Sequence, residues 1–146
     1  MGWIDLDPAS SEAANAFVKA RKIYTIQDNG LVQPWHGRVF MNHPFSREFN
    51  RAWIQKLVAE YENDEVEQAC CITFAATSEA WFRPLLRQPN CFLVPRTNYY
   101  LPDGTKKRGV TKGSVVTYFG EHADAFARCF AHLGEVKIAH QYTRTV

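Results

Sequence analysis

The 146-residue sequence predicts an α/β fold in which helices cover a mostly parallel sheet, with an antiparallel hairpin toward the C-terminus. Segments with strand and helix patterns alternate along the chain, which is typical of a doubly wound sheet. Residues 69–76 form a nearly all-apolar strand, and such a strand needs cover on both faces. No internal repeat or low-complexity segment divides the chain, so we expect a single domain over residues 1–146.

Short elements follow one another at the start of the chain. Residues 3–7 have the pattern of a short strand, which Pro8 ends. A serine pair that ends at Ser11 can cap a helix over 12–18, because a serine hydroxyl accepts a hydrogen bond from an otherwise unpaired helix amide. A second short strand is expected at 22–25.

The next elements are a turn, a strand and a long helix. Residues 28–30 (Asp-Asn-Gly) are a turn signal, and residues 38–41 form a strand that ends before Pro44. Residues 46–62 follow as a helix with large apolar side chains at i, i+4 spacing on one face. These inward positions are Phe49, Trp53, Leu57 and Tyr61.

The C-terminal half continues the alternation. Residues 78–87 are predicted as a helix, and 91–94 as the strand after it. A strand at 114–119 can pair with 91–94 as a long hairpin, because a Pro-Asp-Gly turn signal lies between them. The last two predicted elements are the helix 121–132 and the strand 136–139.

Composition excludes several classes of protein. Aromatic residues make up 14% of the chain, too many for a disordered segment. There is neither an apolar run of the ~18 residues that span a membrane nor a secretory signal pattern, so we expect a cytoplasmic protein. The four cysteines form no C-x-x-C pair and have no histidine at metal-ligand spacing, so we expect buried, reduced thiols and no metal. Phosphate-binding glycine motifs are also missing, which disfavours an unrelated nucleotide-binding protein.

One segment carries a local excess of positive charge. The whole chain has a net charge of +2, whereas residues 96–112 contain five basic residues and one acid, Asp103. Such a loop indicates a polyanionic partner, although an ordinary solvated hairpin tip would have the same composition. The basic residues are Arg96, Lys106, Lys107, Arg108 and Lys112.

The sharpest chemical signal is Asn42-His43-Pro44-Phe45, directly after the predicted strand 38–41. The Asn42 side-chain oxygen and the backbone carbonyl of His43 can accept both N–H bonds of an exocyclic amino group and so help to localise its lone pair. Pro44 would stiffen the bend, and Phe45 can stack on the face of an extruded base. A plain turn at a strand end is the alternative for these four residues.

The segments around this motif give it a context. Taken in order, they resemble the phage-type (Dam-like) DNA N6-adenine methyltransferases, whose motif is Asn/Asp-Pro-Pro-Tyr/Phe. The matching segments are 5–10 (Asp-Leu-Asp-Pro-Ala-Ser), 24–25, 28–31, 35–39 (Trp-x-Gly-x-Val), 42–45, 53–56 (Trp-x-x-Lys), 81–82, 113–116 and 119–120.

The resemblance implies a Rossmann-like, S-adenosylmethionine-dependent methyltransferase fold. It implies direct methyl transfer from S-adenosylmethionine to N6 of adenine in DNA, without a metal or a covalent enzyme intermediate. It also implies a phage or prophage gene whose product acts in the cytoplasm of a bacterial host. The sequence carries no signal for an oligomeric state.

The same resemblance assigns roles to residues. Asp7, Pro8 and Ala9 would border the S-adenosylmethionine site, Asp28, Asn29 and Leu31 would contact the cofactor adenine, and Asn42, His43, Pro44 and Phe45 would hold the target adenine. Asp7 and Asp28 would otherwise be turn or helix caps. The fold also permits a set of DNA contacts that no motif identifies. The residues that would make them are Arg96, Asn98, Tyr99, Lys106, Lys107, Arg108 and Lys112.

Three departures from the family pattern define an alternative. His43 replaces the usual first proline; its backbone carbonyl is expected to matter, and a general-base imidazole is the less favoured role. Ser10, Ser11 and Glu12 stand where most methyltransferases have a Gly-x-Gly loop. Only Met1 and Gly2 stand where the family has a Thr-Pro segment, so we expect a fold shortened at the N-terminus. The alternative is a truncated or impaired relative that binds DNA or a protein partner without methylating.

Overall fold

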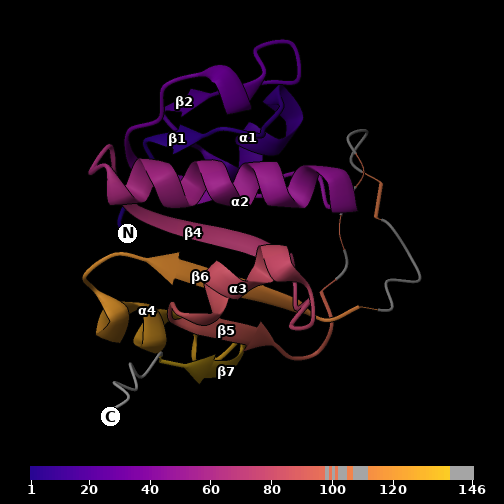
Figure 1. The fold of residues 1–146 in the computed structure, drawn as a ribbon, viewed down its shortest axis with the longest axis vertical. Coiled ribbons are helices and arrows are strands. Elements are labelled where there is room, and N and C mark those ends of the chain that lie inside the picture. The colour runs from indigo at the N-terminus through magenta and orange to yellow at the C-terminus, as the bar shows by residue number, and fades with distance from the viewer. Residues whose placement is uncertain (98, 100, 102–104, 107–111, 139–146) are drawn as a thin grey trace.

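The computed structural model describes residues 1–97, 99, 101, 105–106 and 112–138. Seven strands in these residues form one sheet, in the order β2-β1-β3-β4-β6-β5-β7 (Figure 1). The strands are β1 (Leu6–Asp7), β2 (Lys22–Ile23), β3 (Gly37–Met41), β4 (Val66–Phe74), β5 (Asn90–Leu93), β6 (Ser114–Phe119) and β7 (Gly134–Lys137). The helices are α1 (Glu12–Val18), α2 (Arg47–Glu62), α3 (Arg83–Leu86) and α4 (Ala123–Phe130), with 3-10 turns η1 (Gly30–Val32) and η2 (Ala80–Phe82).

The sheet divides into a parallel half and an antiparallel half. β1 pairs in parallel with β2 and β3, and β3 pairs in parallel with β4. β6 pairs antiparallel with β4 and β5, and β7 pairs antiparallel with β5. The predicted hairpin of β5 and β6 is confirmed. The expectation of a mostly parallel sheet is not confirmed, because β6 lies between β4 and β5 and leaves three of the six pairings among the described strands parallel.

Helices cover both faces of the sheet. Side chains alternate along a strand, so Cys71 of β4 joins a core that includes Leu57 of α2, while Cys70 joins a second core that includes Phe126 of α4. Figure 1 shows α2 lying along β4, and α4 beside β5 and β7. The apolar β4 is therefore covered on both faces, as its sequence predicts.

The long helix α2 begins and ends within one residue of its predicted bounds. Ser46 caps it, because its hydroxyl accepts a hydrogen bond from the Phe49 amide at 3.3 Å. Trp53 and Leu57 are buried as predicted, but Phe49 is 45% exposed. Each i, i+4 step turns about 40° around the helix axis, so a run of four such positions drifts off the buried face.

Other predicted bounds are wrong or shifted. The predicted helix 78–87 is a 3-10 turn followed by the four-residue α3, because Pro84 cannot donate a hydrogen bond inside a longer helix. The predicted strands 3–7 and 22–25 shorten to two residues each. The predicted last strand begins two residues earlier than expected, and position 139 lies outside the described residues.

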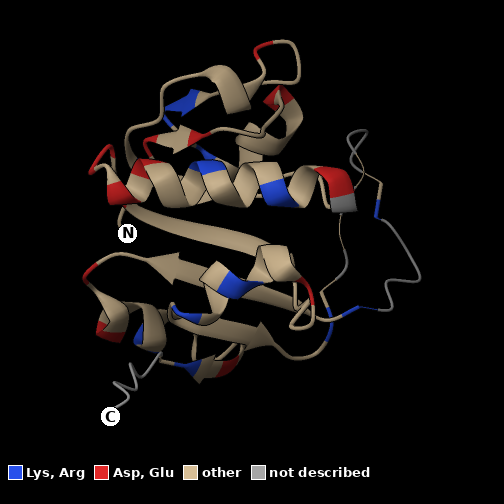
Figure 2. Cartoon of the chain, viewed as in Figure 1, with Lys and Arg blue, Asp and Glu red and all other residues tan. Residues whose placement is uncertain are grey.

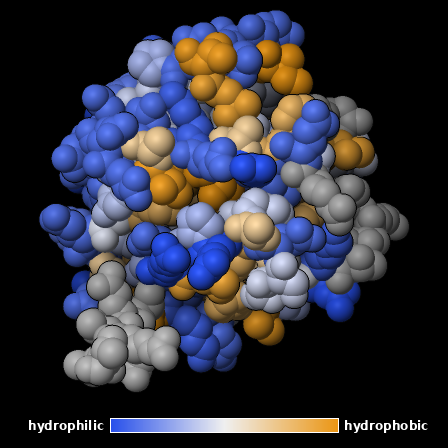
Figure 3. All heavy atoms as spheres, in the orientation of Figure 1, coloured by the Kyte–Doolittle hydropathy of each residue, from blue (hydrophilic) through white to orange (hydrophobic). Residues whose placement is uncertain are grey.

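Apolar side chains remain exposed near β1 and β2. Phe17, Ile26 and Val32 are mostly exposed, and Figure 3 shows apolar side chains gathered at this end of the molecule. The cysteines are unpaired, but Cys129 is exposed, contrary to the expectation of buried thiols. It lies beside the stripe of α4 that packs inward through Phe126 and Phe130. No helix of the described chain is long and apolar enough to cross a membrane.

Candidate active site

Three strand ends meet at one edge of the sheet. β1, β3 and β4 are consecutive parallel neighbours, so their carboxyl ends point the same way. Asp7 ends β1, Asn42 directly follows β3, and Ala75 directly follows β4. The two loops that the family resemblance predicts to bind the cofactor and the target adenine thus follow adjacent strands.

The loop after β1 contains a buried acid. The Asp7 carboxyl is 2% exposed and accepts a hydrogen bond from the Ala9 amide at 3.2 Å. Burial raises the pKa of Asp7 to about 6, which outweighs the lowering by hydrogen bonds from Ala9 and Ser10. The Tyr24 amide donates to the Asp7 carbonyl at 3.0 Å, and this bond ties the loop to the segment after β2.

Asp28 and Asn29 shape their own turn. Asp28 Oδ2 accepts hydrogen bonds from the Thr25 amide at 2.8 Å and the Thr25 hydroxyl at 3.0 Å. The bond from the Thr25 amide holds the pKa of the exposed Asp28 carboxyl below its usual value. The Asn29 side chain caps η1 by accepting from the Leu31 amide at 3.3 Å. Asp28 therefore has the turn role that was its alternative to cofactor contact, and Asn29 has a capping role in the same turn.

Gly30 lets the two predicted cofactor loops approach each other. A Cβ atom at this position would lie 2.0 Å from the Pro8 carbonyl oxygen and 3.1 Å from the Trp53 ring. The Trp35 indole N–H donates to the Gly30 carbonyl at 2.8 Å. Only glycine fits this backbone approach, which is one of the uses of glycine in proteins.

The loop Asn42–Phe45 combines an exposed amide with a buried imidazole. Asn42 and Pro44 are exposed, whereas His43 is 2% exposed. The His43 ring stacks on Trp53 at 6.3 Å between centroids and meets the edge of Phe45 at 5.6 Å. Asn42 is therefore exposed at the surface, while the next residue, His43, is anchored in the core.

The His43 side chain is part of the structure of this loop. His43 Nε2 lies 2.7 Å from Asn50 Oδ1, and burial lowers the pKa of His43 to about 4. The ring is therefore neutral near pH 7, and Nδ1 is buried without a hydrogen-bond partner. The His43 side chain therefore has a structural role, in addition to the role expected of the His43 backbone carbonyl. Its burial makes a general-base role less favourable.

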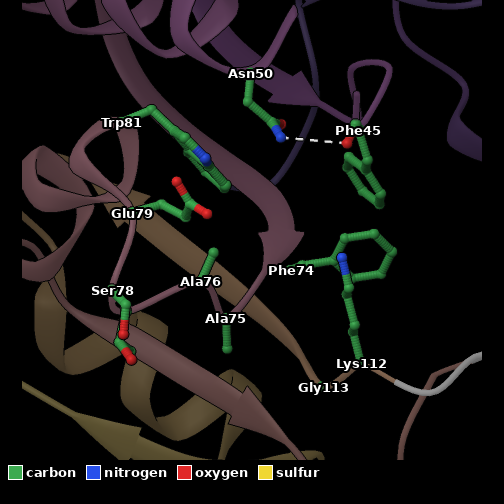
Figure 4. Close-up of a pocket in the computed structure, with 11 residues that line it drawn as sticks. Phe45, Asn50, Phe74, Ala75, Ala76, Ser78, Glu79, Trp81, Lys112 and Gly113 are labelled. Atoms are coloured by element: carbon green, nitrogen blue, oxygen red, sulfur yellow. Dashed lines mark hydrogen bonds between the residues drawn. The ribbon is translucent and has the colours of Figure 1, made fainter. Parts of the chain in front are cut away.

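A cavity of about 430 Å³ opens beside Phe45 (Figure 4). Phe45, Phe74 and Trp81 line it with aromatic rings, and Asn50 and the segment 75–79 complete much of its wall. The Phe45 ring lies 4.7 Å from that of Phe74. Sequence analysis did not predict this cavity. The feature that could have indicated it is the loop after β4, which lies at the same sheet edge as Asn42.

The basic segment is described only in part. Arg96, Lys106 and Lys112 are exposed, whereas Asn98, Lys107 and Arg108 lie outside the described residues. Lys112 also lines the cavity, and its Nζ lies 5.5 Å from the Phe74 ring. Figure 2 shows basic residues along the described parts of this connection.

Tyr99 lies in the aromatic cluster. Its ring meets the edge of Phe45 at 5.2 Å and that of Phe74 at 5.9 Å. Its hydroxyl hydrogen-bonds the Ser114 hydroxyl, at the start of β6. The structure therefore places Tyr99, predicted as a DNA contact, among packed rings beside the cavity.

The described residues fit a bound nucleoside-like cofactor in part. Gly30 brings the Asp28 turn against the Pro8 backbone, and Asp28 is exposed with only Oδ2 engaged in its turn, so Oδ1 can accept from a ligand hydroxyl or amino group. No group of three His, Cys, Asp or Glu side chains within the described chain has a metal-site arrangement.

Comparison with known proteins gives one match. A family model described as DNA N-6-adenine-methyltransferase (Dam) matches residues 1–128. No curated protein and no solved structure matches the chain. The family match spans most of the 146 residues, so the chain belongs to the DNA N-6-adenine-methyltransferase (Dam) family. Membership indicates a transferase that methylates adenine in DNA.

Proposed function

We propose that this Dam-family chain transfers a methyl group from S-adenosylmethionine to N6 of adenine in DNA. The observation that carries the proposal is the exposed Asn42 directly after β3, in the loop whose Phe45 lines an aromatic cavity. A phage or prophage origin, and action in a bacterial cytoplasm, belong to the same proposal.

The two acceptors of the loop act on the amino group. Asn42 Oδ1 and the His43 carbonyl accept its N–H bonds, which helps to localise the N6 lone pair for attack. Bound S-adenosylmethionine would supply the methyl group: its bond to sulfur would break as the new N–C bond forms, the electron pair would stay on sulfur, and the extra amino proton would pass to water. Acceptors placed before the reaction need no reorganisation as positive charge develops on nitrogen.

The cavity offers space for an extruded base. Its volume of about 430 Å³ lies within the usual range for small-molecule sites. Phe45, Phe74 and Trp81 supply aromatic faces, and base stacking on such faces contributes about 1–3 kcal/mol per base. Lys112 at the rim, with Arg96 and Lys106, would pair with phosphates, which positions DNA without reading its sequence.

The cofactor would bind at the adjacent loops. Asp7 ends β1, Pro8 and Ala9 follow it, and the turn of Asp28, Asn29 and Leu31 packs against this loop through Gly30. Ligands of open α/β sheets bind outside the carboxyl ends of the strands, which supports this placement. The loop that would hold the cofactor then follows the strand next to the one that Asn42 follows.

The proposal is tested by methyl transfer from radiolabelled S-adenosylmethionine to unmethylated DNA. Asn42→Ala should lower the rate by about 10²-fold, because the lost acceptor acts on the chemical step. Cofactor affinity, measured by calorimetry, should change less than about twofold, since Asn42 does not contact the cofactor in this scheme.

The matched control is Asn63→Ala, which removes an exposed amide at the far end of α2 and should leave the rate unchanged. Wild-type chain that binds the cofactor but transfers no methyl group would instead identify an impaired relative. An Asn42→Ala rate equal to wild type would remove Asn42 from the mechanism.

A further inference from the structure

One buried side chain holds both ends of the bend after Asn42. Asn50 lies in the first turns of α2 and is 4% exposed. Its Oδ1 lies 2.7 Å from His43 Nε2, and its Nδ2 donates to the Phe45 carbonyl at 3.2 Å (Figure 4). A single amide thus fixes the residue before Pro44 and the residue after it.

The two hydrogen bonds determine each other's direction. Asn50 Nδ2 faces the Phe45 carbonyl as a donor, so Oδ1 faces the imidazole and can only accept. The proton of neutral His43 must therefore lie on Nε2, and Nδ1 is bare. Rotating either side chain would break a hydrogen bond and leave buried polar groups unpaired, which is unfavourable.

Ring packing restricts His43 further. Its imidazole stacks on Trp53 at an interplanar angle of 22° and packs against the Phe45 ring at 79°. With the ring packed against both neighbours and Nε2 bonded to Asn50, the backbone of His43 has little freedom. The direction of its carbonyl, and of the preceding Asn42, follows from this restraint.

We propose that Asn50 is a positioning residue for methyl transfer: with His43 it fixes the bend that presents the two amino-group acceptors and the Phe45 ring. This inference rests on the proposed function, and it assigns the His43 imidazole to the support of the loop. Geometric errors of about 1 Å can cost 10²-fold in rate, so a support residue has a large kinetic effect.

The first test compares two replacements of His43. In His43→Gln, the side-chain amide can place a donor where Nε2 stood, whereas the shorter side chain of His43→Asn cannot reach Asn50. His43→Gln should keep the rate of methyl transfer within about fivefold of wild type, and His43→Asn should lose about 10- to 100-fold. Equal losses in both variants would overturn the proposal, because the hydrogen bond would then be irrelevant.

The second test separates positioning from stability. Asn50→Leu removes both hydrogen bonds, and Asn90→Leu is its control: Asn90 is also buried, and its amide bonds the Leu85 and Gln88 carbonyls in the other half of the sheet. Both variants should lower the melting temperature. Only Asn50→Leu should lower kcat, by about 10-fold or more, with the cofactor KM nearly unchanged. An equal kcat loss in both variants would show a merely structural role.

A third measurement does not need activity. Imidazole nitrogen chemical shifts in NMR spectra report the tautomer of His43: wild type should show protonated Nε2 and bare Nδ1, and Asn50→Leu should lose this single form. If wild type transfers no methyl group but shows the expected tautomer, the proposed function fails while the support of the loop stands. A wild-type Nδ1–H tautomer would overturn the inference whatever the activity.

Discussion

The loops after β1 and β3 lie side by side at one edge of the sheet, but different forces hold them. Backbone contacts hold the first: Gly30 packs on the Pro8 carbonyl, and the Tyr24 amide bonds the Asp7 carbonyl. Side chains hold the second, through the imidazole of His43 and the amide of Asn50. A backbone contact tolerates almost any side chain except at the glycine, whereas a side-chain network depends on each of its members.

The two loops also respond to pH in opposite directions. Asp7 has a pKa of about 6, above its ordinary 3.8, so the folded chain binds the extra proton and stability falls as pH rises from about 4 to about 6. His43 has a pKa of about 4, below its ordinary 6.5, so stability falls as pH drops from 6.5 toward 4. In the folded chain Asp7 is neutral below about pH 6 and His43 is neutral above about pH 4, so both buried groups are neutral between these values.

Removing the Asp7 charge should have the largest effect on stability. At pH 8 the buried carboxylate is ionised, so Asp7→Asn should stabilise the fold by up to about 3 kcal/mol in denaturant unfolding. At pH 4 the carboxyl is already protonated in the folded chain, so the same variant should gain little. A gain of equal size at both values would mean that charge burial is not the cause.

The same variant tests function in the first loop. A charge kept at a cost in stability is a frequent mark of a binding site. If Asp7 borders the cofactor, Asp7→Asn should weaken S-adenosylmethionine binding in calorimetry while it stabilises the chain. Unchanged affinity would leave the buried charge without a role in the cofactor site.

Gly30→Ala should break the first loop and spare the second. Its Cβ would overlap the Pro8 carbonyl, and backbone atoms can move away only by distorting the turn, so we expect a loss of about 2–3 kcal/mol. Gly113→Ala is the control for stability, because a Cβ there would meet no atom within 4 Å. The His43 tautomer should remain as in wild type, and a changed tautomer would show that the two loops are not independent.

Trp53→Phe should have the smallest effect on stability, but it should affect both loops. Trp53 stacks on His43 and lies against Gly30, and phenylalanine keeps an aromatic ring of smaller area. We expect a loss of about 1 kcal/mol in unfolding experiments, with small decreases in both cofactor affinity and transfer rate. A decrease in only one of the two would show that Trp53 supports a single loop.

Local sequence patterns predicted most of the helices and strands, but they did not predict the full strand order or which residues meet in the cavity. The bounds of α2 and β6, and the positions of Asp7 and Asn42 at strand ends, follow from periodicity and turn residues, which act over short distances along the chain. The His43–Asn50 bond crosses a helix start, and no periodic pattern encodes it. The cavity joins Phe45, the end of β4 and Lys112, and residues so distant in sequence meet only after the sheet has formed. The insertion of β6 between β4 and β5 likewise depends on the pairing of whole strands.

That insertion has a consequence for the order in which the protein forms. β6 is fully buried and pairs with β4 along six residues, yet a ribosome completes β4 well before β6 emerges. Until then, the apolar nine-residue β4 has one edge without a partner, and such edges recruit strands from other chains. Pairing of β4 with β6 also joins segments far apart in sequence, which slows folding. The centre of the sheet thus stays open until β6 has emerged, and nascent chains that end before residue 114 should aggregate more readily than chains that include β6.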